Sequence, residues 1–138
     1  MKNSCHYFRK RVKKMIPKFR AWDKRENTMR DVAVLHFTKG GKVNSIEYWK
    51  TPSELKSYHV RNLVLMQSTG LKDEKRKMIF EGDILFDKHH NPQIGVVVFY
   101  EGAFQLLANN MYYPLIQFDG DVEIIGNIHE NPELLEVK

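Results

Sequence analysis

The sequence predicts a mainly β fold with minor α content, in which an N-terminal β-rich subdomain with one short helix packs on a C-terminal SH3-like small barrel. Two observations lead to this prediction. Short apolar segments recur along the chain, and turn residues separate them. Several short strands at such regular spacing are typical of small barrels and sandwiches. The 138 residues, of which 42% are hydrophobic, are enough for one domain or for two subdomains that share a core.

Three strands and one helix are predicted in the first half of the chain. The strands are expected at residues 19–22, 29–37 and 43–49. Gly40 and Gly41 indicate a tight hairpin, because glycine accepts the positive φ that such turns need. The segment Thr51-Pro52-Ser53-Glu54 has the spacing of a capping box, with proline at the first helical position. It therefore predicts a short helix that ends near Tyr58.

The second half is predicted to consist mostly of strands joined by short turns. Apolar strands are expected at residues 62–67, 78–86, 94–100, 103–108 and 121–128. A charged loop is expected at 70–77, and Asp119-Gly120 gives another hairpin signal. Asn131 is expected to cap a terminal helical turn at 132–135. These expectations divide the chain into a basic tail, an N-terminal β-rich subdomain and a barrel subdomain, at residues 1–14, 15–70 and 71–138.

The positive charge of the chain is concentrated in its first residues. The full chain has a net charge of +5, but residues 1–14 contain six basic side chains and no acidic one. The rest of the chain has 16 basic against 17 acidic residues, so its net charge is −1. A basic tail attracts phosphates, which makes nucleic-acid contact one hypothesis. Its candidate residues are Arg9, Lys10, Arg11, Lys13, Lys14, Arg20, Lys24 and Arg25.

Two simpler interpretations of the tail stay open. It can be a solvated, disordered extension that binds nothing. Alternatively, translation can start at Met15, which opens a sequence that looks like a natural start.

The sequence predicts no enzyme active site, no cofactor and no metal site. None of the six histidines has the spacing of a helical zinc site, and the single cysteine has no partner. Asp119, Asp121 and Glu123 alternate near a turn and could hold a divalent cation, but carboxylates around a turn are usually solvated. No glycine loop has the spacing of a phosphate-binding motif.

The sequence also predicts a cytoplasmic protein that does not contact the membrane. Cys5 cannot pair within the chain, which fits a reducing compartment. No run of 18 apolar residues is present, and no apolar stretch follows Lys2 as it would in a secretory signal.

Four ordered motifs resemble those of the YopX family. They are Lys18–Asp23, Leu65–Asp73, Ile79–Ile84 and Val122–Leu135. The similarity spans residues 15–136, and the tail lies outside it. The resemblance implies a protein encoded by phages or prophages, with an SH3-like C-terminal barrel and a homo-oligomeric state, in the cytoplasm of the host cell. It implies no established activity and transfers no catalytic residue. The glycines of the motifs, Gly82 and Gly126, are expected to serve tightly bent strands.

These observations lead to three hypotheses about function. The first is a phage accessory protein without enzymatic activity, an oligomeric module that binds a host or phage protein. The second is a nucleic-acid-binding protein that uses the basic tail. The third is a counter-defence protein that sequesters a nucleotide signal or inhibits a host defence enzyme.

Overall fold

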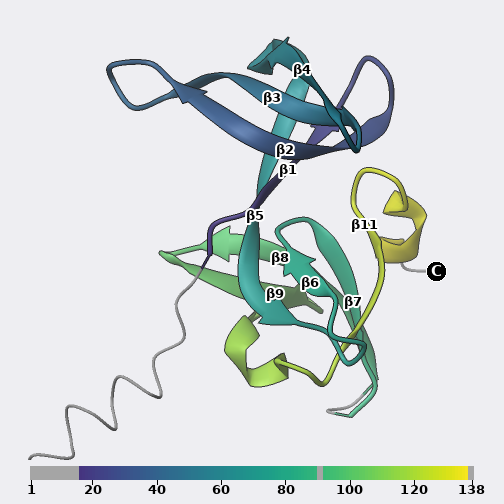
Figure 1. The fold of residues 1–138 in the computed structure, drawn as a ribbon. Helices are drawn as coiled ribbons and strands as arrows, with labels where there is room; N and C mark the ends of the chain where they lie inside the picture. Colours follow the sequence, from purple (N-terminus) through teal and green to yellow (C-terminus); the bar gives the residue numbers. More distant parts are fainter. Residues whose placement is uncertain (1–15, 90–91, 137–138) are drawn as a thin grey trace, which may run out of the picture.

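The chain folds into two antiparallel sheets in a computed structural model that describes residues 16–89 and 92–136 (Figure 1). The first sheet has the strand order β4-β3-β2-β1-β5-β6, and the second has the order β10-β9-β8-β7-β11. The strands are β1 (Phe19–Asp23), β2 (Thr28–Phe37), β3 (Val43–Thr51), β4 (Glu54–His59), β5 (Leu63–Lys72), β6 (Met78–Phe80), β7 (Asp83–Asp87), β8 (Gln93–Tyr100), β9 (Ala103–Ala108), β10 (Met111–Pro114) and β11 (Glu123–Asn127). Three short 3-10 helices complete the described part: η1 (Val60–Asn62), η2 (Leu115–Phe118) and η3 (Pro132–Leu135). The mainly β prediction is confirmed.

The SH3-like barrel is not confirmed. In the second sheet β10 and β11 form the two edges, and the described pairings do not join them into a closed barrel. The division of the chain at residues 14 and 70 also stays a prediction.

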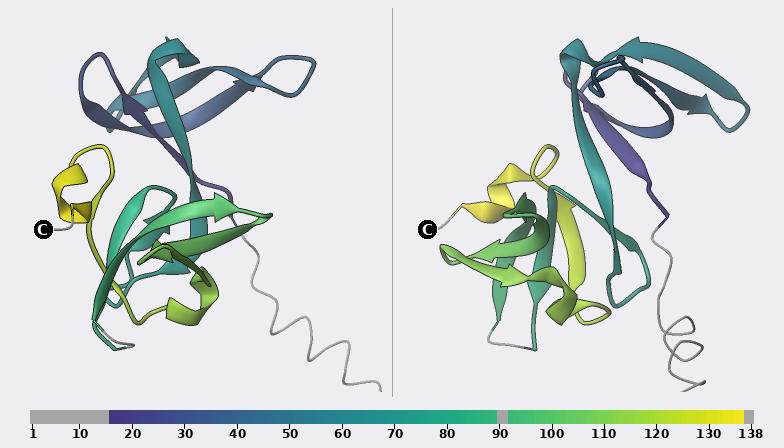
Figure 2. Two further views of the ribbon diagram at one scale, coloured as in Figure 1. Left: turned by 180° about the vertical axis from the view of Figure 1, so that it is seen from behind. Right: turned by 90° about the vertical axis from the view of Figure 1, so that its left-hand side faces the viewer.

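The long strand β5 belongs to both halves of the molecule. Its first part, from Leu63 to Gln67, pairs with β1 of the N-terminal layer. Farther along, Ser68 is the partner of Phe80 in β6, which leads into the second sheet. Figures 1 and 2 show β5 running from the upper layer to the lower one. One continuous strand therefore ties the two layers together.

Each half has its own apolar core. In the second half, eight buried residues form one cluster: Ile79, Leu85, Val97, Leu106, Ala108, Leu115, Phe118 and Val122. The cluster of the first half has four buried members, Ala21, Ile46, Tyr48 and Leu63. Partly buried apolar side chains surround both clusters. The second half thus holds the larger fully buried core.

The prediction of a helix after Thr51 is wrong, because residues Glu54–His59 form the strand β4. The Thr51 hydroxyl accepts a hydrogen bond from the amide of Ser53 at 3.4 Å, so it forms a turn instead of a helix cap. Leu55 then pairs with Trp49 across the hairpin. Cross-strand pairing and the packing of Tyr58 on the first core outweigh the local helix signal.

Four smaller differences concern the second half. The strand predicted at 78–86 is broken between β6 and β7, where Gly82 has a φ of 88° that glycine accepts without strain. Residues 115–118 form η2, so the Asp119-Gly120 turn follows a helical turn and not a strand. The edge strand β10 was not predicted. The Asn131 side chain does not cap η3 but accepts a hydrogen bond from the amide of Asn127 at 3.3 Å.

A polar junction holds the two sheets against each other. Arg20 of β1 donates to the Asp83 carboxylate of β7 at 2.8 Å and to the Glu81 carbonyl at 3.2 Å. Asp83 also accepts from the amide of Phe80 at 2.8 Å, and the guanidinium of Arg20 lies 4.8 Å from the centre of the Phe80 ring. Three of these four residues belong to the motif at 79–84, so that motif has a structural role here.

Burial and charge perturb two titratable groups at this junction. Burial raises the pKa of Asp83, and the Arg20 cation offsets only part of that rise. His129 stacks on Trp22 with the ring centres 5.5 Å apart. Burial lowers the pKa of His129, and the charge of Arg20 lowers it further, whereas Glu130 raises it.

Candidate binding sites on the two sheets

The basic residues that the sequence predicts as nucleic-acid contacts fall into three groups. Arg9, Lys10, Arg11, Lys13 and Lys14 lie outside the described residues. Arg20 pairs with Asp83 at the junction, and its side chain is only 15% exposed there. Lys24 and Arg25 are exposed in the turn that follows β1. The structure therefore separates Arg20 from the other two described candidates.

Arg25 instead meets basic residues that the sequence did not single out. It lines a pocket of about 390 Å³ together with Lys56 and Arg61, which come from β4 and η1. Sequence reasoning missed both because it placed Lys56 on a helix and had no pairing to bring η1 near the β1–β2 turn. The available signal was a tyrosine, Tyr58, between the basic residues Lys56 and Arg61.

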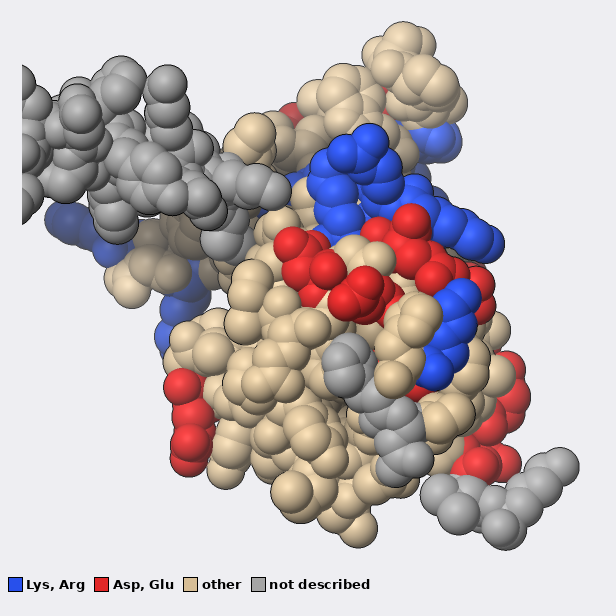
Figure 3. All heavy atoms as spheres, turned by 90° about the horizontal axis from the view of Figure 1, so that it is seen from below, with Lys and Arg blue, Asp and Glu red and all other residues tan. Residues whose placement is uncertain are grey.

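The described charges are sorted between the two halves of the chain. Residues 16–62 carry ten basic and five acidic side chains, a net charge of +5. Residues 63–136 carry five basic and twelve acidic side chains, a net charge of −7. The view of the molecule from below shows a broad area without Lys, Arg, Asp or Glu next to clustered acidic side chains (Figure 3). The near-neutral body of the protein thus consists of two oppositely charged halves.

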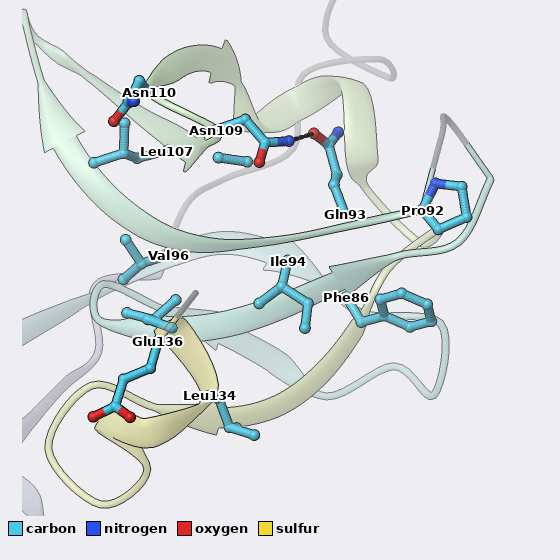
Figure 4. Close-up of a pocket in the computed structure, with 12 residues that line it drawn as sticks. Phe86, Pro92, Gln93, Ile94, Val96, Leu107, Asn109, Asn110, Leu134 and Glu136 are labelled. Carbon is cyan, nitrogen blue, oxygen red and sulfur yellow. Dashed lines mark hydrogen bonds between the residues drawn. The ribbon is translucent and has the colours of Figure 1, made fainter. Parts of the chain in front are cut away.

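A groove of about 650 Å³ lies on the outer face of the second sheet. Apolar side chains from β7, β8, β9 and η3 line it (Figure 4): Phe86, Ile94, Val96, Leu107 and Leu134. Polar side chains at its rim include Gln93, Asn109, Asn110 and Glu136. Because side chains alternate along a strand, Ile94 and Val96 face the groove while Val97 packs in the core.

The described lining of this groove consists mainly of apolar side chains and amides. Among the described residues that line it, Glu136 is the one titratable side chain. Asn109 donates to the Gln93 amide oxygen at 3.4 Å, which leaves amide groups at the rim for a ligand. Within the described residues, no group of three or more His, Cys, Asp or Glu side chains could hold a metal ion.

Comparison with known proteins gives the family. The model of the family described as YopX protein matches residues 18–136. The chain belongs to the YopX family. A comparison with the curated proteins found no match. No helix in the described part of this YopX-family chain is long and apolar enough to span a membrane.

Two solved structures resemble this YopX-family chain. The crystal structure of protein EF1440 from Enterococcus faecalis is 31% identical, with a TM-score of 0.66, and the match covers 89% of this chain and 100% of that one. The X-ray crystal structure of protein yopX from Bacillus subtilis is 22% identical, with a TM-score of 0.60, and the match covers 86% of this chain and 98% of that one. The second likeness supports the fold alone.

Proposed function

We propose that this YopX-family chain is a phage accessory protein without enzymatic activity, which binds a peptide segment of a host or phage protein in the groove on its second sheet. The segment that fits has apolar anchors next to Lys or Arg side chains. The observation that carries this proposal is an apolar groove with a polar rim in the acidic half of the molecule, with no Lys or Arg among the described residues that line it.

The floor of the groove supplies the affinity. Burying one exposed aliphatic or aromatic side chain contributes about 1.5–3 kcal/mol. Ile94 is 40% exposed in the isolated chain, so it has apolar surface left to bury against a partner. A groove of about 650 Å³ is in the size range of ligand sites.

The charge of the surrounding half supplies the selectivity. Glu136 lines the groove just after η3, Glu133 lies on η3, and both are exposed. Twelve acidic against five basic residues in this half attract a cationic segment and repel an anionic one. Such steering accelerates association and weakens with added salt.

The test is fluorescence anisotropy with two labelled peptides that share leucine anchors and carry either Lys or Glu between them. The Lys peptide is expected to bind the full chain and the Glu peptide is not. Ile94→Asp should weaken binding by about tenfold or more, because it places an unpaired charge on the apolar floor. Ile116→Asp is the matched control, since Ile116 is 66% exposed and lies outside the groove.

Three results would overturn the proposal. One is equal binding of the two peptides, and another is equal weakening by the two substitutions. The third comes from light scattering on the free protein. If the free protein is an oligomer, and Ile94→Asp dissociates it while Ile116→Asp does not, the groove binds a second copy of this chain.

A further inference from the structure

A pocket on the basic half of the molecule has the parts of a nucleotide site. Three segments form it: the turn after β1, the end of β4, and η1. Its cations are Arg25, Lys56 and Arg61, and its aromatic residue is Tyr58. The described residues that line it include no Asp or Glu.

A buried carboxylate fixes the turn that carries Arg25. Asp23 is fully buried and accepts from the amides of Arg25 at 3.0 Å and Glu26 at 3.3 Å. Its other oxygen accepts from the guanidinium of Arg30 at 3.2 Å, so the charge of Asp23 is balanced inside the fold. Asp23 therefore positions the turn without offsetting the exposed cations of the pocket.

The backbone joins this turn to η1 directly. The amide of Lys24 donates to the Asn62 carbonyl at 2.9 Å. Within η1, the amide of Arg61 donates to Nδ1 of His59 at 3.1 Å, which leaves Nε2 of the neutral ring as a donor. Two segments that are distant in sequence are thus held at a fixed separation before any ligand arrives, which lowers the entropy cost of binding.

The aromatic ring of the pocket packs between a guanidinium group and the first core. The Arg25 guanidinium lies 4.5 Å from the centre of the Tyr58 ring, and the Tyr58 and Tyr48 rings are 6.4 Å apart. Arg30 covers Tyr48 in turn at 4.7 Å. The Tyr58 hydroxyl is buried and has no hydrogen-bond partner among the described residues. Tyr58 therefore contributes its ring beneath Arg25, and not its hydroxyl, to the pocket.

We propose that this pocket binds a nucleotide unit, with its phosphate at Lys56 and Arg61 and its base stacked on the Arg25 guanidinium. Guanidinium planes and aromatic rings stack unpaired bases, and Lys and Arg bind phosphate. The net charge of +5 on residues 16–62 extends the attraction beyond the pocket. The same chemistry serves a free nucleotide and a unit of a single-stranded nucleic acid, and it is independent of the groove on the second sheet.

The experiment measures anisotropy of the full chain with a labelled oligothymidylate of about twelve nucleotides, competed by unlabelled ATP. Arg61→Gln is expected to weaken oligonucleotide binding by about tenfold, because a charge-assisted phosphate contact is lost. It should also lower the slope of log affinity against log salt by about one. Lys39→Gln in the β2–β3 hairpin removes an equal charge outside the pocket and should change affinity by less than about threefold.

A second variant separates stacking from charge. Arg25→Lys keeps the cation but loses the planar face, so it should weaken binding nearly as much as Arg25→Gln. If ATP displaces the oligonucleotide at concentrations near the dissociation constant of ATP itself, the site binds free nucleotides. If ATP does not displace it, the site binds the nucleic-acid chain. The proposal would be overturned if Arg61→Gln and Lys39→Gln weakened oligonucleotide binding equally. It would also be overturned if Arg25→Lys bound the oligonucleotide as tightly as the wild type. Absence of binding to both probes would overturn it as well.

Discussion

The two halves of this YopX-family chain differ in what they bury and in what they expose. The first half, residues 16–62, packs with Leu63 at the start of β5 around a small core of four buried apolar residues, and it exposes an excess of cations. The second half has a core of eight such residues and exposes an excess of carboxylates, with an apolar groove on its outer face. The single strand β5 and the Arg20–Asp83 contact join them. A net charge of −1 for the body therefore conceals two surfaces that suit different ligands.

The largest expected effect comes from breaking the contact between the halves. Arg20→Ala leaves the Asp83 carboxylate buried without its cation, so it should cost about 3 kcal/mol of unfolding free energy near neutral pH. Urea unfolding measures the loss. Lys39→Ala, in an exposed hairpin, is the control and should change stability by less than about 0.5 kcal/mol.

The pH dependence of the Arg20→Ala loss gives a second check on the junction. Burial already raises the pKa of Asp83, and loss of Arg20 raises it further. The folded variant holds that proton more tightly than the unfolded chain, so stability falls as pH rises from the usual value of 3.8 through the folded pKa. The unfolding free energy lost through Arg20→Ala should therefore be smaller at about pH 4 than near neutral pH. A loss that is equal at both pH values would contradict the role of the ion pair.

The next effect contrasts how tightly the two halves are packed. A Cβ on Gly95 of β8 would lie 2.7 Å from the Leu107 carbonyl oxygen and 2.9 Å from the Ala108 Cβ. Gly95→Ala should thus destabilise the protein by about 2 kcal/mol. Gly40 in the β2–β3 turn has its nearest neighbour at 3.8 Å, so Gly40→Ala should cost less than about 0.5 kcal/mol. Thermal unfolding of both variants checks the difference, and similar costs would show that Gly95 can relax.

The smallest effect is the titration of His129 at the junction. Its pKa is lowered in the folded protein, so the unfolded chain takes up a proton first as the pH falls below 6.5. The stability that the neutral ring contributes is present above pH 6.5 and is lost as the pH falls toward the folded pKa. His129→Phe keeps a ring next to Trp22 and removes the titration. Between about pH 7.5 and pH 5, the variant should lose less unfolding free energy than the wild type, as measured by urea unfolding followed by tryptophan fluorescence. An equal loss in both proteins would contradict this account.

The sequence predicted the strands whose patterns are local. The alternation of β2 and β3 around Gly40-Gly41, and that of β8 and β9 around Glu101-Gly102, is enough to place four strands close to their observed bounds. The strand β4 was not predictable in this way. Its opening residues fit a helix cap equally well, and only the pairing of Leu55 with Trp49 decides between the two.

The candidate sites depended on contacts between distant segments. Arg25 was predicted as a ligand-binding residue, but its neighbours Lys56 and Arg61 join it only through the fold. The groove combines Phe86, Leu107 and Leu134 from three separate segments. Their hydrophobicity predicts burial, and nothing local distinguishes an apolar residue in the core from one on the outer face of the sheet.

The most direct test of a division of ligands between the halves is amide chemical-shift mapping by NMR of the full chain. The oligothymidylate and the Lys-containing peptide are added separately and then together. We expect the oligonucleotide to shift residues 24–26 and 56–62, and the peptide to shift residues 86, 93–96, 107–110 and 134–136. Each set should persist when the other ligand is present. Overlapping shifts, or displacement of one ligand by the other, would contradict the account.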